Sequence, residues 1–121
     1  MTTFSNLIFI NLIYLFFQSI IIPLNALLKP YDRNKWYCGT DSIMHGIAKT
    51  VTINSCTLDE YVLINRCCYH HDNCYELKLG KERCDKQFCK CMKVKSKTCK
   101  LLTLGFCFAT EGYGLDAYKE L

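Results

Sequence analysis

Two pairs of cysteines with equal spacing constrain the fold of this chain more than any other feature. Cys67 and Cys74 are seven residues apart, and so are Cys84 and Cys91. Seven residues make about two helical turns, so each pair lies on one face of a helix. Gly80 predicts a short turn between the helices, which makes them antiparallel. Cys67 then faces Cys91 and Cys74 faces Cys84 in a single register, because both pairs are centred on position 79.

The residues around these cysteines set the expected helix boundaries. Thr57 and Glu60 fit a capping box, so the first helix is predicted from about Leu58 to Leu79, with the glycine of the turn as its C-cap. The second helix is predicted to start at Lys81 and to fray over residues 93–97. The expected fold class is therefore mainly α: a small disulfide-rich domain built on two antiparallel, disulfide-stapled helices.

Two segments outside these helices give weaker signals. Residues 43–55 have no convincing hydrophobic period, and we expect mostly loop there, with at most one helical turn. The tail from Cys99 contains three glycines and is predicted to form a turn and a short helix from Leu115.

The N-terminal segment has the pattern of a secretory signal peptide. The first 28 residues carry no charge, and residues 7–22 are apolar except for three polar side chains. We therefore assign 1–26 as a signal peptide, cleaved near Ala26, and 27–121 as one small domain. An uncleaved membrane anchor is the alternative, because no basic residue precedes the apolar run, although that run is slightly short of the ~20 residues that a span needs.

The cysteine content indicates a disulfide framework and an extracellular location. All ten cysteines follow the apolar segment, in a domain of 95 residues. A core of this size is too small to hold a fold alone, and exported domains compensate with disulfides. The alternative is a zinc site with Cys68, His71 and Cys74 as ligands, which oxidation of the thiols in an exported chain would prevent.

Basic residues are concentrated in one part of the chain. Nine lie between Lys78 and Lys100, against two acids, Glu82 and Asp85. One interpretation is a solvated helix face; the other is attraction to an anionic surface such as acidic lipid headgroups. We do not expect nucleic acid as the partner of an exported, disulfide-rich chain.

The predicted register brings a histidine and a carboxylate together. His71 faces about residue 87, and Asp85 lies within about one turn of that level. A buried histidine oriented by a carboxylate is a general base near neutral pH. Asp72 projects about 100° around the helix from His71 and suits a hard cation such as calcium. The alternatives are a packed, structural His71 and an Asp85 on the surface that pairs with Lys81 or Lys86.

The motif that contains His71 resembles the active-site helix of secreted phospholipases A2. Eight residues match that family's Cys-Cys-x-x-His-Asp-x-Cys pattern: Cys67-Cys68-Tyr69-His70-His71-Asp72-Asn73-Cys74. The second helix is similar to that of the bee-venom-like branch in its Cys84-Asp85, Phe88 and Cys91. A third run resembles the start of the family's calcium loop, with an aspartate in place of its second glycine: Trp36-Tyr37-Cys38-Gly39-Thr40-Asp41.

This resemblance implies a set of site residues and disulfides. His71 and Asp85 would be catalytic, and calcium would be held by the carboxylate of Asp72 and the backbone carbonyls of Tyr37, Gly39 and Asp41. The resemblance adds a Cys38–Cys68 bridge to the two that the register predicts. For the four remaining cysteines we expect the pairs Cys89–Cys99 and Cys56–Cys107.

The implied function is that of a secreted, calcium-dependent phospholipase A2. Such an enzyme hydrolyses the sn-2 ester of glycerophospholipids at a membrane surface, here an anionic one, to a lysophospholipid and a free fatty acid. The alternative is a non-catalytic phospholipase A2-like secreted protein that binds a receptor, a channel or a lipid surface. A disulfide-rich, toxin-like module unrelated to lipids is a third possibility.

Overall fold

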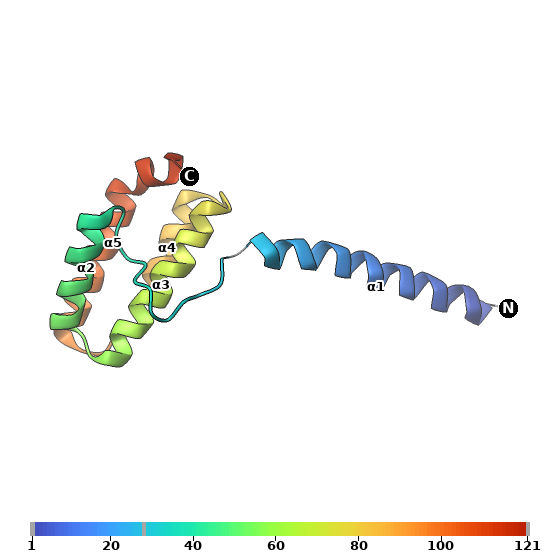
Figure 1. Ribbon diagram of the computed structural model, residues 1–121, viewed down its shortest axis with the longest axis horizontal. Helices are drawn as coiled ribbons and strands as arrows, with labels where there is room; N and C mark the ends of the chain where they lie inside the picture. Colours follow the sequence, from blue (N-terminus) through green and yellow to red (C-terminus); the bar gives the residue numbers. More distant parts are fainter. Residues whose placement is uncertain (1, 28, 121) are drawn as a thin grey trace. The chain divides into compact units, whose positions relative to one another are not determined.

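The computed structural model describes residues 2–27 and 29–120, which fall into two compact units (Figure 1). The first unit ends at Pro30 and consists of one helix, α1 (Thr2–Leu27). Among the described residues, no helix combines the length and the hydropathy that crossing a bilayer requires. The assignment of 1–26 as a signal peptide stays a prediction.

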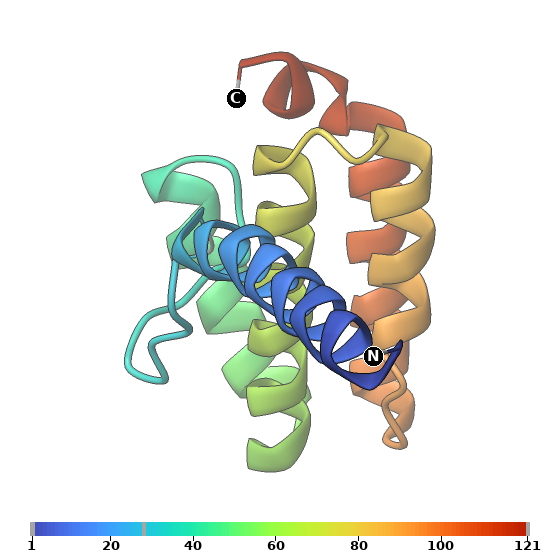
Figure 2. The ribbon, with the colours of Figure 1, turned by 90° about the vertical axis from the view of Figure 1, so that its right-hand side faces the viewer.

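The second unit, from Tyr31 onward, contains four helices and all five disulfides. Its helices are α2 (Ser42–Ser55), α3 (Leu58–Glu76), α4 (Lys81–Cys91) and α5 (Lys97–Glu120). They run lengthwise beside one another, and α3 packs against α4, which packs against α5 (Figures 1 and 2). The described part of this unit has no strand, so the predicted mainly α, disulfide-rich fold is confirmed.

Helix α3 begins as predicted but ends three residues early. Thr57 and Glu60 form the expected capping box. At the other end, Lys78 has a positive φ of 52°, and the backbone N–H of Leu79 donates to the carbonyl of Cys74. This is a Schellman-type ending with a lysine at the left-handed position. Gly80, with φ 99°, is therefore the N-cap of α4 and not the C-cap of α3.

Residues 43–55 form the helix α2, so the expectation of mostly loop was wrong. Asp41 caps this helix, because its carboxylate accepts the backbone N–H groups of Ile43 and Met44. Only Ala48 and Thr52, one turn apart, are buried along it. A stripe this narrow leaves most apolar residues of α2 exposed, which is why the sequence shows no clear hydrophobic period.

The tail forms one continuous helix, and the predicted turn with a short helix from Leu115 was wrong. Helix α4 ends at Cys91 and residues 92–96 are not helical, close to the fraying expected over residues 93–97. Helix α5 then runs on through three glycines. Glycine weakens a helix interior by about 1 kcal/mol relative to alanine, and packing against α2 and α4 with two disulfides outweighs that effect here.

Three disulfides agree with the predictions and two do not. The bridges Cys67–Cys91 and Cys74–Cys84 join α3 to α4, and Cys38–Cys68 joins the N-terminal loop to α3. The other two are Cys56–Cys99 and Cys89–Cys107, so the expected pairs Cys89–Cys99 and Cys56–Cys107 were wrong. The long α5 explains the difference, because its first turn meets the end of α2 and Cys107, about two turns later, lies beside α4.

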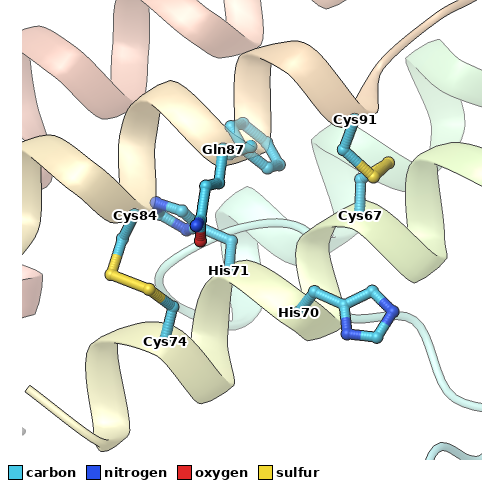
Figure 3. Close-up of a pocket in the computed structure, with 8 residues that line it drawn as sticks. Cys67, His70, His71, Cys74, Cys84, Gln87 and Cys91 are labelled. Atoms are coloured by element: carbon cyan, nitrogen blue, oxygen red, sulfur yellow. A yellow bond between two sulfur atoms is a disulfide. The ribbon is translucent and has the colours of Figure 1, made fainter. Parts of the chain in front are cut away.

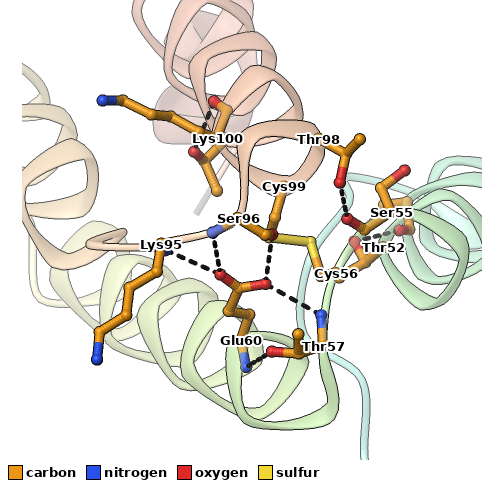
Figure 4. Close-up of a disulfide and its surroundings, with 12 residues drawn as sticks. Thr52, Ser55, Cys56, Thr57, Glu60, Lys95, Ser96, Thr98, Cys99 and Lys100 are labelled. Atoms are coloured by element: carbon orange, nitrogen blue, oxygen red, sulfur yellow. Dashed lines mark hydrogen bonds between the residues drawn. A yellow bond between two sulfur atoms is a disulfide. The ribbon is translucent and has the colours of Figure 1, made fainter.

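A single carboxylate ties the start of α3 to the junction of α4 and α5 (Figure 4). The carboxylate of Glu60 accepts the backbone N–H groups of Lys95 and Ser96, each at 2.8 Å, and the Ser96 hydroxyl at 2.7 Å. It also accepts the backbone N–H of Thr57. These hydrogen bonds, led by that of the Ser96 backbone, lower the pKa of Glu60 to about 2.

We expect Glu60→Gln to remove a pH-dependent part of the stability. The pKa of Glu60 is about 2 in the folded protein against 4.5 ordinarily, so the carboxylate stabilises the fold above about pH 4.5 and loses this effect as the pH falls toward 2. Urea unfolding at pH 7 and at pH 3 should therefore show a large deficit of the variant at pH 7 and a smaller one at pH 3. Asp59→Asn, at the exposed neighbouring acid, is the control. A deficit of equal size at both pH values would contradict this role.

Candidate active site

The predicted histidine–carboxylate pair is present in the interface of α3 and α4. The Nε2 atom of His71 lies 2.8 Å from Oδ1 of Asp85, and both side chains are buried. The imidazole packs against two rings, with its centroid 4.2 Å from that of Tyr75 and 4.6 Å from that of Phe88. The ring orientation is thus fixed by these two contacts as well as by the carboxylate.

Two further side chains hold Asp85. The Tyr75 hydroxyl donates to Oδ1 at 2.6 Å, and the Lys81 ammonium donates to Oδ2 at 2.6 Å. Lys81 also donates to the backbone carbonyls of Thr110 and Glu111 and so connects the carboxylate to α5. Asp85 is therefore buried and paired with Lys81, whereas Lys86 pairs with Glu82 on the surface.

No role of Tyr75 is predicted from the sequence, and Lys81 is expected there only as a surface partner of Asp85. Tyr75 lies one turn after His71, and Lys81 lies one turn before Asp85, so helical spacing is the signal that points to both. Gly114 of α5 lies close to the Tyr75 hydroxyl. A Cβ atom at position 114 would lie 2.6 Å from the Tyr75 hydroxyl, so only glycine leaves room for that group.

The electrostatics favour a neutral imidazole beside a charged carboxylate. Burial lowers the pKa of His71 more than the hydrogen bond to Asp85 raises it. Burial alone would raise the pKa of Asp85, but hydrogen bonds from Lys81, Tyr75 and His71 outweigh it and hold that pKa below its usual value. At neutral pH the pair is therefore an imidazole, able to accept a proton, oriented by an ionised carboxylate.

A small cavity lies between the two disulfides that join α3 and α4 (Figure 3). Its volume is about 50 Å³, and its lining includes His71, Gln87 and Phe88. A water molecule needs roughly 10–15 Å³ of such space, whereas drug-sized ligands need several hundred. The cavity has room for a water beside His71, and a lipid would have to approach from the surface.

The candidate calcium loop is anchored one helical turn from Asp72. The Cys38–Cys68 disulfide ties the loop to α3, and the backbone N–H of Tyr37 donates to the Asn65 side chain at 2.8 Å. Asp72 follows Cys68 by four residues and therefore lies on the same side of α3. Although Asp72 is exposed, desolvation by the surrounding protein raises its pKa to about 7, with Glu76 adding to the rise and Lys35 opposing it.

Part of the expected ligand set fits calcium. Asp72 offers an exposed carboxylate, and backbone carbonyls complete an all-oxygen set that a hard cation prefers. Asp41 already forms other hydrogen bonds, because its carboxylate caps α2 and its carbonyl accepts the N–H of His45 at 2.8 Å. Its φ of −136° is ordinary extended backbone, so this position does not require the glycine found in the family loop.

The cysteines do not form a metal site. A group of Cys56, Glu60 and Cys99 has ligand atoms within 4.8 Å of one another. Both sulfurs belong to one disulfide, and Glu60 is occupied by four hydrogen bonds, so this group is structural. The zinc alternative at Cys68, His71 and Cys74 was wrong for the same reason, since both thiols are in disulfides.

Comparison with known proteins finds a relative whose name is phospholipase A2-like. The chain is 38% identical, over 102 aligned residues, to a phospholipase A2-like protein of Caenorhabditis elegans. The chain is thus related to a phospholipase A2-like protein. The alignment covers 79% of this chain and 58% of that relative. No protein-family model and no solved structure matches the chain. The relation extends over most of the chain, and it does not distinguish the bee-venom-like branch from others.

We expect Gly39→Ala to disrupt the loop. Gly39 has a φ of 116°, and a Cβ atom there would lie 2.6 Å from the backbone nitrogen of His45. Backbone strain of this kind costs on the order of 1–3 kcal/mol, and the clash adds to it, so the free energy of unfolding in urea should fall by at least that much. Gly46→Ala is the matched control, because a Cβ there meets nothing within 4 Å and alanine favours the helix. An equal effect of the two changes would show that Gly39 is not required.

Proposed function

We propose that this protein is a secreted, calcium-dependent phospholipase A2 that hydrolyses the sn-2 ester of glycerophospholipids. The observation that supports this most is the 2.8 Å contact between Nε2 of His71 and Asp85, in a buried site beside a small cavity of about 50 Å³. Asp72, next to His71 in sequence, supplies an exposed carboxylate for a cation. The name of the nematode relative points to the same family.

In the proposed reaction, His71 acts as the general base through Nδ1, because Nε2 faces Asp85. Nδ1 removes a proton from a water molecule, and the water oxygen forms a bond to the sn-2 carbonyl carbon. When the ester C–O bond breaks, the same proton passes from Nδ1 to the glycerol oxygen, which leaves as the alcohol. Asp85 holds the tautomer with the proton on Nε2 and stabilises the imidazolium between these steps.

The residues that would hold calcium are Asp72, through its carboxylate, and Tyr37, Gly39 and Asp41, through backbone carbonyls. Calcium, when bound, would supply Lewis-acid polarisation of the ester carbonyl. Asp41 would have to share its carbonyl between this role and the first hydrogen bond of α2. We therefore expect Asp72 and the carbonyls nearest the Cys38–Cys68 bridge to dominate cation binding.

The setting of the reaction follows from the rest of the chain. Five disulfides are typical of a protein that folds in an oxidising compartment, and residues 1–26 fit a signal peptide, which favours secretion. The excess of basic residues between Lys78 and Lys100 favours an anionic membrane surface as the place of action.

Product analysis tests the proposed reaction. The protein is incubated, in calcium, with a phospholipid that carries different acyl chains at sn-1 and sn-2. We expect mass spectrometry to detect only the sn-2 fatty acid and the lysophospholipid that retains the sn-1 chain. Release from sn-1, or equal release from both positions, would contradict the assignment.

The second candidate function is a non-catalytic, phospholipase A2-like binding protein. The observation that favours it is the use of both oxygen groups of Asp41 in capping α2, which competes with cation binding. Calorimetric titration of the folded protein with calcium separates the two candidates. Calcium binding that Asp72→Asn abolishes supports the enzyme, and an absence of binding supports the alternative.

A further inference from the structure

The outward face of α4 carries a stripe of basic side chains. Arg83, Lys86 and Lys90 are spaced by three and four residues and are all exposed. Together with Gln87 they form what we name the α4 ridge. These residues, with Gly80 and Glu82, line a shallow open groove of about 540 Å³ on the protein surface.

The positive charge of this ridge is only partly compensated. Lys86 pairs with Glu82 at 2.6 Å, and both of these side chains are highly exposed. In the part of the chain that the structure describes, no acid lies within ion-pair distance of Arg83 or Lys90. The other acid of α4, Asp85, is buried and engaged by Lys81 on the inner side of the helix. Glu111 of α5 also acts on Lys86 electrostatically, so a ligand approaching α4 from solvent meets three cations against the carboxylates of Glu82 and Glu111.

The α4 ridge borders the cavity that contains His71. Gln87 lines both the groove and the cavity, and Figure 3 shows its side chain extending from α4 toward His71. A surface docked on the ridge would lie next to the mouth of the cavity. The exposed residues of the ridge are all charged or polar, so docking there would be electrostatic and would not insert apolar side chains.

We propose that the α4 ridge docks an anionic phospholipid bilayer, with headgroup phosphates in the groove, and so brings the bilayer to the cavity beside His71. The role of this docking in catalysis rests on the proposed function, whereas the docking of the bilayer on the α4 ridge does not. Arginine and lysine are suited to phosphate oxygens, Arg83 through its planar fork and the lysines as point charges. Binding of this kind weakens as salt is raised.

The test compares two triple variants of the full chain with equal loss of charge. One is Arg83→Gln, Lys86→Gln and Lys90→Gln; the control is Arg33→Gln, Lys49→Gln and Lys119→Gln, at exposed basic residues of the N-terminal loop, α2 and α5. Sedimentation with mixed phosphatidylcholine–phosphatidylserine vesicles is measured in chelator, so that no lipid is hydrolysed. Each cation near an anionic surface raises the affinity for it about fivefold. The ridge variant should therefore bind the vesicles on the order of 100-fold more weakly than wild type, and the control should bind within about fivefold of wild type.

Three results would overturn the proposal. The first is an equal loss of binding in both triple variants, once circular dichroism has shown that both are folded. The second is equal binding of the wild type to pure phosphatidylcholine vesicles, and the third is retention by heparin without binding to the anionic vesicles. Because binding is measured without turnover, the outcome is separate from that of the enzyme assays. A ridge-dependent loss of binding in a protein that releases no fatty acid would support the docking surface and contradict only the proposed catalysis.

Discussion

Replacing His71 by Gln is expected to lower the rate of fatty-acid release by a factor of about 10²–10⁴, which is the usual contribution of a positioned general base. The imidazole is buried, neutral at pH 7 by the direction of its pKa shift, and held by Asp85 at 2.8 Å. Glutamine keeps a polar side chain of similar length but cannot accept and return a proton. The loss should therefore appear in kcat, measured on vesicles in calcium, with the binding of vesicles unchanged.

The neighbouring histidine supplies the control for this change. His70 is exposed and lies outside the dyad, so His70→Gln should retain activity within about tenfold of wild type, less than the contribution of a general base. A similar loss in both variants, or full activity in His71→Gln, would show that His71 is a packed histidine without a catalytic role.

Replacing Asp85 by Ala is expected to lower the free energy of unfolding by about 3 kcal/mol, the lower end for breaking a buried ion pair. Asp85 is 2% exposed and accepts hydrogen bonds from His71, Tyr75 and Lys81. Its removal leaves three donors without their acceptor in the interface of α3 and α4. The carbonyls of Thr110 and Glu111 still bind Lys81, which is why we expect the lower end of the range.

Urea unfolding measures this change, and Glu82→Ala is the control on the same helix. Glu82 also pairs with a lysine one turn away, but both partners are exposed, so we expect no measurable change. The free energy of unfolding of Asp85→Asn should lie between those of wild type and Asp85→Ala, because an amide still accepts a hydrogen bond through its oxygen. If Asp85→Ala lowers the free energy of unfolding by less than about 1 kcal/mol, the network does not support the fold.

The parts of the fold predicted correctly were those that local rules determine. Equal cysteine spacing on two helices joined by a short turn fixes one register, and the bridges Cys67–Cys91 and Cys74–Cys84 have it. The same register places His71 beside Asp85, so the dyad could be predicted from the sequence. The capping box at Thr57 and Glu60 is likewise a local interaction between residues three positions apart.

The parts predicted wrongly depend on tertiary contacts. Helix α2 buries only Ala48 and Thr52, and α5 contains three glycines, so neither has a strong helical signal of its own. With α5 taken as a turn and a short helix, the register of Cys99 and Cys107 against the other helices could not be derived. The correct pairs, Cys56–Cys99 and Cys89–Cys107, require knowing that α5 spans the length of the domain.

In the candidate site, too, local spacing could be used for prediction and tertiary contacts could not. Spacing predicted His71, Asp85 and Asp72 as site residues, whereas the bonds of Tyr75 to Asp85 and of Lys81 to α5 depend on how the helices pack. Gly114 is needed only because the Tyr75 hydroxyl occupies the space where its side chain would be.

The rate of fatty-acid release from anionic vesicles, in calcium and in chelator, tests the central claim most directly. The wild-type protein should release fatty acid in calcium, lose this activity in chelator and regain it when calcium is restored in excess. Equal release in calcium and in chelator, or no release in either by protein shown to be folded, would contradict the claim that this chain is a calcium-dependent phospholipase A2.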